Sequence, residues 1–165
     1  MKDSFDRVLN DAFNTEIPIS ATIELTTLCN WKCKHCYINF HDEKGLPELK
    51  IKELLREFRE LGVHQLVLTG GEIFIRKDIL RIIRYAKELH FRVNILSNAS
   101  LVTDEVAKEL SELYITEYSL TIFSLNEDIH DNITGVKGSL RAALNGIELL
   151  KKYNIPVELK TPILK

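Results

Sequence analysis

Hydrophobic positions along the chain follow two alternating patterns. Short apolar runs predict β-strands, and longer stretches in which apolar residues recur every three or four positions predict amphipathic helices. The predicted strands are Ile19–Thr27, Gln65–Thr69, Phe91–Leu96, Glu117–Phe123 and Val157–Thr161. The predicted helices lie between them, at Leu49–Leu61, at Lys77–Leu89, after Thr103 and after Ser139. A short helical lead-in is expected within residues 1–18, so that residues 19–165 form one domain.

Local signals support the helix boundaries. Gly62 follows Leu49–Leu61 at the point where a helix would stop. Thr103 precedes Asp104 and Glu105. Thr is a favoured N-cap residue, and acidic side chains in the first turn complement the helix dipole. Strands that alternate with helices in this way indicate right-handed parallel βα units, and therefore an α/β fold.

Candidate functional residues gather at the ends of the predicted strands. In parallel α/β sheets the chemistry lies at the C-terminal ends of the strands. Here these ends carry Cys29, then Gly70, Gly71 and Glu72, then Ser97 and Asn98, and finally Thr121. Gly and Asn also serve in ordinary turns, and Thr fills strands, so turn or packing roles are the alternative for all but the cysteine.

Composition narrows the class of protein. The 165-residue chain has a formal net charge of -2, which gives no electrostatic reason to expect nucleic acid as a partner. No apolar run approaches the ~20 residues that a membrane span needs, so no membrane partner is expected. The only cysteines are three that lie close together, unlike the even, dispersed set of a secreted disulfide framework. We therefore expect a cytoplasmic protein with reduced thiols.

The cysteines themselves indicate a metal site. Cys29, Cys33 and Cys36 have the spacing C-x3-C-x2-C. Cubane iron–sulfur clusters commonly take four thiolates, so three thiolates can leave one iron with the open position that chemistry requires. We predict a [4Fe–4S] cluster on these cysteines. The alternative is a Cys3His zinc site that adds His35 or His41, although His35 directly precedes Cys36 and is an awkward partner in so small a loop.

With this loop placed after the first strand, the chain resembles the radical S-adenosylmethionine (radical SAM) superfamily. C-x3-C-x2-C is the signature of that superfamily, and Gly70-Gly71-Glu72 matches its Gly-Gly-Glu motif. The stretches Ile23–Asn30 and His130–Gly135 are similar to the SPASM-type subgroup, which modifies peptides and proteins. The resemblance covers about Ser20 to Lys165 and implies a partial parallel (β/α) barrel of the TIM type, truncated after the fifth strand.

The resemblance also implies an activity. The open iron would bind S-adenosylmethionine (SAM), and the reduced cluster would cleave it to a 5′-deoxyadenosyl radical. Gly70 and Gly71 would let the backbone approach the methionine, and Glu72 would bind its ammonium group. The other residues that the resemblance assigns to SAM are Ser97, Asn98, Thr121, His35 and Tyr37. The implied partners are SAM, a peptide or protein substrate, and a reductant such as flavodoxin or ferredoxin.

Some features depart from the superfamily pattern. Ile73 stands where proline is common, Ala99 where glycine is common, and Phe123-Ser124 where an Asp-Gly or Tyr-Gly pair is frequent. The superfamily core continues beyond a fifth strand, so we expect a truncated or split protein, or self-association through the uncovered sheet edge. A non-catalytic binding module that keeps the half-barrel, with or without zinc or an iron–sulfur cluster, is the alternative function. His130 and Asp131 are expected to tie down the loop before the last helix.

Overall fold

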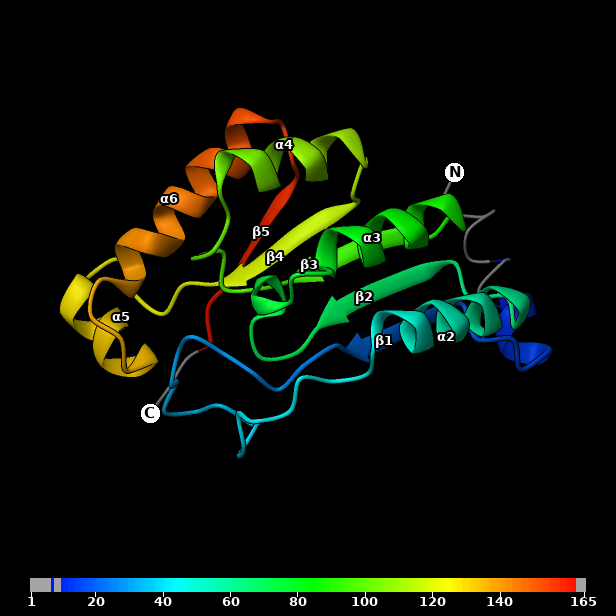
Figure 1. Ribbon diagram of the computed structural model, residues 1–165, viewed down its shortest axis with the longest axis horizontal. Helices are drawn as coiled ribbons and strands as arrows, with labels where there is room; N and C mark the ends of the chain where they lie inside the picture. The colour runs from blue at the N-terminus through cyan, green and yellow to red at the C-terminus, as the bar shows by residue number, and fades with distance from the viewer. Residues whose placement is uncertain (1–6, 8–9, 163–165) are drawn as a thin grey trace.

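Five parallel strands form one sheet at the centre of the protein (Figure 1). The computed structural model describes residue 7 and residues 10–162. The strands lie in chain order, so β1 and β5 are the two edges of the sheet. They are β1 (Ser20–Glu24), β2 (Gln65–Thr69), β3 (Arg92–Leu96), β4 (Glu117–Thr121) and β5 (Val157–Lys160). The predicted α/β fold with five parallel strands is confirmed.

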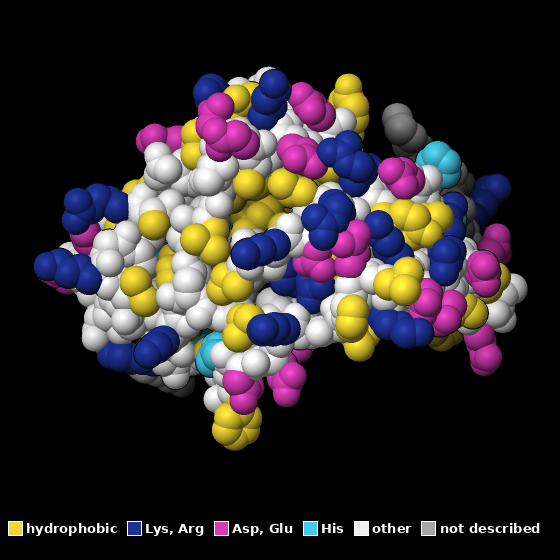
Figure 2. Space-filling view, viewed as in Figure 1, with side chains coloured by type: hydrophobic (Ala, Val, Ile, Leu, Met, Phe, Trp, Pro, Cys, Tyr) yellow, Lys and Arg dark blue, Asp and Glu magenta, His cyan; other side chains and the backbone are white. Residues whose placement is uncertain are grey.

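Helices follow each strand from β1 to β4. They are α2 (Glu48–Glu60), the short 3-10 helix η1 (Ile73–Ile75), α3 (Ile79–Glu88), α4 (Asp104–Glu112), α5 (Glu127–Thr134) and α6 (Ser139–Lys152). Because right-handed crossovers that all step in the same direction place their helices on one face, α2, α3, α4 and α6 form a single layer along the sheet (Figure 1). Positive and negative side chains lie side by side over α2 and α3 (Figure 2), where Glu48 pairs with both Arg81 and Lys52. Hydrogen bonds from Arg81 and Lys52 lower the pKa of Glu48 to about 2.

The two faces of the sheet differ in polarity. One row across the sheet, from Ile23 through Leu68 and Ile95 to Tyr118, is buried, and its last three members are completely covered. The next row points to the opposite face because side chains alternate along a strand. It runs Glu24, Thr69, Leu96, Ser119 and Glu158. The apolar core therefore lies between sheet and helices, and the other face is polar.

Some boundaries differ from the sequence prediction. β1 ends at Glu24 rather than at Thr27, because the Thr27 amide donates to the Glu43 carbonyl instead of to a neighbouring strand. β4 ends at Thr121, and helix α5 was not predicted. The Thr103 cap is confirmed, since its hydroxyl accepts from the Val106 amide.

Residues 10–14 are helical, and the division into a lead-in and a domain stays a prediction. Among the described residues no helix has the length and apolarity to cross a membrane.

A buried glycine in α6 offers a test of the packing. A methyl group on Gly146 would collide with the Ala99 carbonyl oxygen. We expect Gly146→Ala to lower the free energy of unfolding by about 1–3 kcal/mol, although alanine is the better helix former by about 1 kcal/mol. Exposed Asn145 is the matched control, and Asn145→Ala should be neutral or slightly stabilising. Urea unfolding of both variants measures this, and a Gly146→Ala protein as stable as wild type would contradict the packing.

Candidate functional site

A cavity of about 230 Å³ lies at the C-terminal ends of the strands. Its wall includes the last residues of β2, β3 and β4, which are Thr69, Leu96 and Thr121. Every site residue predicted from the sequence lines it, except Glu72. These residues are Cys29, Cys33, Cys36, His35, Tyr37, Gly70, Gly71, Ser97, Asn98 and Thr121. The fold thus brings together groups as far apart in the sequence as Cys29 and Thr121.

The three cysteines are free and partly buried. Burial raises the pKa of Cys29, and burial together with the neighbouring thiols raises that of Cys33 to about 11. Such thiols stay protonated at neutral pH unless a cation compensates their charge, and a coordinating metal deprotonates them. Their chemistry therefore fits an iron–sulfur cluster. In the described part of the chain, however, no three His, Cys, Asp or Glu side chains are gathered as a ready-made metal site.

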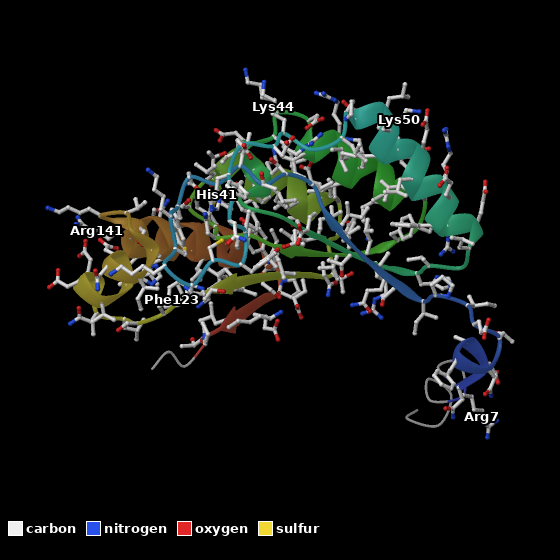
Figure 3. The ribbon with its side chains drawn as sticks, turned by 90° about the horizontal axis from the view of Figure 1, so that it is seen from below. Arg7, His41, Lys44, Lys50, Phe123 and Arg141 are labelled. Atoms are coloured by element: carbon white, nitrogen blue, oxygen red, sulfur yellow. The ribbon has the colours of Figure 1, made fainter. Side chains whose placement is uncertain are left out.

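The histidines considered for zinc have other contacts. The His41 Nδ1 atom lies 3.0 Å from the Thr27 carbonyl oxygen. His35 packs edge-on against Phe123, with ring centres 4.7 Å apart. Figure 3 shows Phe123 just beyond β4, close to the loop that carries the sulfur atoms. The alternative Cys3His arrangement is therefore not assembled among the residues that the structure describes.

Gly70 and Gly71 bring two loops into direct backbone contact. The Gly71 amide donates to the Thr26 carbonyl at 2.8 Å, and the Glu72 amide donates to the Leu28 carbonyl at 2.8 Å. A side chain on Gly70 would collide with the Thr26 carbonyl, and one on Gly71 would collide with that of Leu28. Gly70 also has a φ of 148°, which other residues rarely adopt. The glycine pair therefore joins the loop after β2 to the start of the cysteine loop.

Glu72 lies behind the cavity wall rather than on it. Its side chain is completely buried, and its oxygens accept from the Phe74 amide, the Asn98 amide and the Ser97 hydroxyl at 2.8–2.9 Å. Burial raises the pKa of Glu72, although these hydrogen bonds oppose the shift. The buried Tyr118 hydroxyl donates to the Ser97 hydroxyl at 2.8 Å. Glu72 thus braces the residues that the cavity presents.

Asn98 connects the cysteine loop to the loop after β3. Its side-chain Nδ2 donates to the side-chain Oδ1 of Asn30 at 2.9 Å, and its side-chain Oδ1 accepts from both the backbone amide and the hydroxyl of Ser100. Asn30 in turn donates to the Ser100 hydroxyl at 2.8 Å. The sequence analysis did not single out Ser100, and Asn30 entered it only as part of a motif. The position of Asn30 directly after Cys29 is the signal that could have identified it.

Tyr37 and Thr121 are further predicted residues that line the cavity. Tyr37 is 67% exposed and donates to the Glu24 carboxylate at 2.7 Å. Desolvation and this carboxylate raise the Tyr37 pKa to about 12. Thr121 pairs in register with Lys160, which also lines the cavity. Trp31, Phe123 and Lys160 also line the cavity but were not predicted, because the motifs that carry the resemblance assign them no role.

Comparison with known proteins identifies the family. The family model described as "Radical SAM superfamily" matches residues 23–165. The AdoMet-dependent heme synthase of Oleidesulfovibrio alaskensis is 32% identical over 143 residues, which are 85% of this chain and 37% of that protein. The sporulation killing factor maturation protein SkfB of Bacillus subtilis is 31% identical over 153 residues, which are 90% of this chain and 37% of that protein. The chain therefore spans well under half the length of these relatives.

A solved structure shares the fold. SuiB of Streptococcus suis, bound to its precursor peptide SuiA, superposes with a TM-score of 0.81 at 17% identity. The match covers 99% of this chain and 38% of that one. The same protein bound to S-adenosylmethionine gives a TM-score of 0.80. This likeness confirms the predicted partial barrel. Since the family model covers nearly the whole described fold, the chain belongs to the radical SAM superfamily.

Proposed function

We propose that this chain holds a [4Fe–4S] cluster on Cys29, Cys33 and Cys36 and uses it to cleave SAM in the adjacent cavity. The observation that carries the proposal is that three free thiols line the same cavity as the ends of β2, β3 and β4. When bound, such a cluster supplies the electron that cleaves SAM reductively to a 5′-deoxyadenosyl radical. The protein supplies binding, orientation and exclusion of water.

The cavity residues divide these tasks. Ser97, Asn98 and Thr121 offer hydroxyl and amide groups to the polar parts of SAM. Glu72 acts from behind, because its bonds to the Ser97 hydroxyl and the Asn98 amide hold that loop in position. Gly70 and Gly71 line the cavity with backbone atoms, which the methionine end of SAM would contact, while their missing side chains make room for the loop after β1.

Aromatic rings line part of the cavity and would help to exclude water when SAM is bound. Trp31 is only 4% exposed and lines the wall beside the cysteines. His35 and Phe123 contact each other on the same wall, while the exposed Tyr37 is available to the adenine end of SAM. A drier site strengthens the electrostatic contacts made within it.

The wider reaction is proposed from the relatives. SkfB is a maturation protein and SuiB binds a precursor peptide, which supports a peptide or protein as substrate here. The reductant would be a flavodoxin or ferredoxin. Self-association through the edge strand β5 remains a prediction. The cytoplasm is the proposed location because the thiols must stay reduced.

Loss of the thiols tests the cluster. After anaerobic addition of iron and sulfide, we expect broad sulfide-to-iron absorption in wild type and none in the Cys29/Cys33/Cys36→Ala variant. Reduced wild type should then release 5′-deoxyadenosine from SAM, while the variant should not. The measurements are iron and sulfide content, the visible spectrum and chromatography of the products.

His41→Ala is the matched control, because it should keep the cluster under the proposal but would weaken a Cys3His zinc site. Zinc instead of iron in wild type, lost in His41→Ala, would favour the zinc alternative. A cluster that forms in wild type but yields no 5′-deoxyadenosine would favour the non-catalytic binding module.

Glu72→Gln tests the bracing role. An amide group cannot accept from both the Phe74 and the Asn98 amides, so one buried donor loses its partner, at a cost of about 1–3 kcal/mol of unfolding free energy. Burial raises the pKa of Glu72 above its ordinary 4.5 in the folded protein, so folding favours the protonated carboxyl group. The free energy of unfolding of wild type should therefore fall as the pH rises from about 4.5 through the raised pKa. The variant should lack this part of the pH dependence. Urea unfolding across pH measures both effects.

The matched control for this experiment is Glu148→Gln on the exposed face of α6, which should change stability by less than about 0.5 kcal/mol. If Glu72→Gln leaves stability and its pH dependence unchanged but weakens SAM binding, Glu72 contacts SAM directly, as the resemblance implies.

A further inference from the structure

Helix α5 ends against the cysteine loop. The Lys32 amide donates to the Thr134 carbonyl at 2.8 Å, and the Lys34 amide donates to the Ile133 carbonyl at 2.9 Å. The last carbonyls of a helix have no partner within it, so the cysteine loop satisfies groups that α5 leaves unpaired. Figures 1 and 3 show α5 beside this loop at one end of the molecule. Gly135, with a φ of 70°, then turns the chain away.

These contacts fix the backbone on both sides of one of the three cysteines. Cys33 lies between Lys32 and Lys34, so the backbone on both sides of it is bonded to α5. The Lys34 ammonium group adds a third bond, to the Asn132 side chain at 2.7 Å. Cys36 is connected to the same point, because its amide donates to the Cys33 carbonyl at 3.0 Å. Cys29 is anchored separately, through the Asn30 contacts described above.

Two side chains lock α5 to α6. The Asp131 carboxylate accepts from the Gly138 and Leu140 amides and from the Ser139 hydroxyl. Thr134 and Ser139 share a hydrogen bond of 2.6 Å between their hydroxyls. Since an isolated helix as short as α5 is unstable in water, these contacts with α6 hold it in place. The expectation that Asp131 ties down this loop is confirmed.

His130 joins the same helix to the cavity wall. Its side chain is completely buried, its Nδ1 accepts from the Phe123 amide at 3.3 Å, and its ring meets that of Trp31 edge-on with centres 5.7 Å apart. Trp31 lies between Cys29 and Cys33 in the sequence. We call α5 together with its Asp131 and Thr134 contacts to α6 the α5 clamp.

We propose that the α5 clamp positions Cys33 and Cys36 for the cluster, and that Asp131 is a positioning residue for cluster retention and reduction potential. The inference rests on the proposed function. Groups that orient metal ligands from behind control how firmly the metal is held. The reduction potential of a cluster depends on nearby charge and on exposure to water. The C-terminal end of α5 carries partial negative charge, which disfavours the more negative, reduced state.

The test uses the whole chain loaded with iron and sulfide. In Asp131→Ala we expect the affinity for iron to fall by about 10-fold, the lower end of the range for groups that orient metal ligands, and iron to leave for a chelator correspondingly faster than in wild type. The midpoint potential should rise, because the negative helix end moves away and water enters. Asp131→Asn, which keeps an acceptor, should lie between the two. The electron paramagnetic resonance signal of the reduced cluster provides an independent view of its surroundings.

Two milder variants keep the test valid if Asp131→Ala does not fold. Thr134→Val removes the hydroxyl contact at constant shape, and Asn132→Ala removes only the exposed contact with Lys34. Both variants should release iron faster than wild type, as Asp131→Ala should. Asp128→Ala is the matched control, because Asp128 is exposed in the first turn of α5 and takes no part in the contacts that Asp131 and Thr134 make with α6. It should behave as wild type.

The outcomes separate the two proposals. A wild type that binds no iron or sulfide would overturn the proposed function, and this inference with it. Folded clamp variants with wild-type iron release, potential and resonance signal, even with a lowered melting temperature, would overturn the inference alone. In that case the cluster stands and α5 contributes only to stability.

Discussion

The direct backbone contact between the loops after β1 and β2 determines the geometry of the site. Only residues without a Cβ fit at positions 70 and 71, because the carbonyls of Thr26 and Leu28 occupy the space. This contact sets the position of Leu28, and therefore the starting direction of the cysteine loop. It also turns the next residue, Glu72, inward toward Ser97. One local constraint thus connects the thiols, the glycines and the loop after β3.

The regular part of the fold could be predicted because its signals are local. The apolar period of α2, α3, α4 and α6 and the short runs of the strands are independent of tertiary contacts. Helix α5 escaped prediction because its buried residues, His130 and Thr134, are polar, while the apolar Ile129 is 51% exposed. These polar residues are buried because α5 packs against the cysteine loop, which lies far away in the sequence.

The candidate site could also be predicted in part from the sequence. The cysteines and the strand ends carry chemical signals, and the structure brings them around one cavity. The location of Glu72 behind the wall was not predictable, because it depends on amides of Phe74 and Asn98 that fold over it. A carboxylate in a motif suggests a ligand contact, whereas burial with several donors indicates a bracing role. Only the three-dimensional arrangement distinguishes these two uses of one residue.

The distance along the chain between the cysteine loop and α5 has a consequence for biosynthesis. Lys34 and its partner Asn132 are separated by 98 positions. At the usual pace of translation, about 5–20 residues per second, the thiols leave the ribosome about 5–20 s before the helix that supports them. During this interval the cysteines belong to an unsupported segment that is open to oxidation and to stray metals. Under the proposed function, iron and sulfide would therefore be delivered late, after the synthesis of α5 and α6.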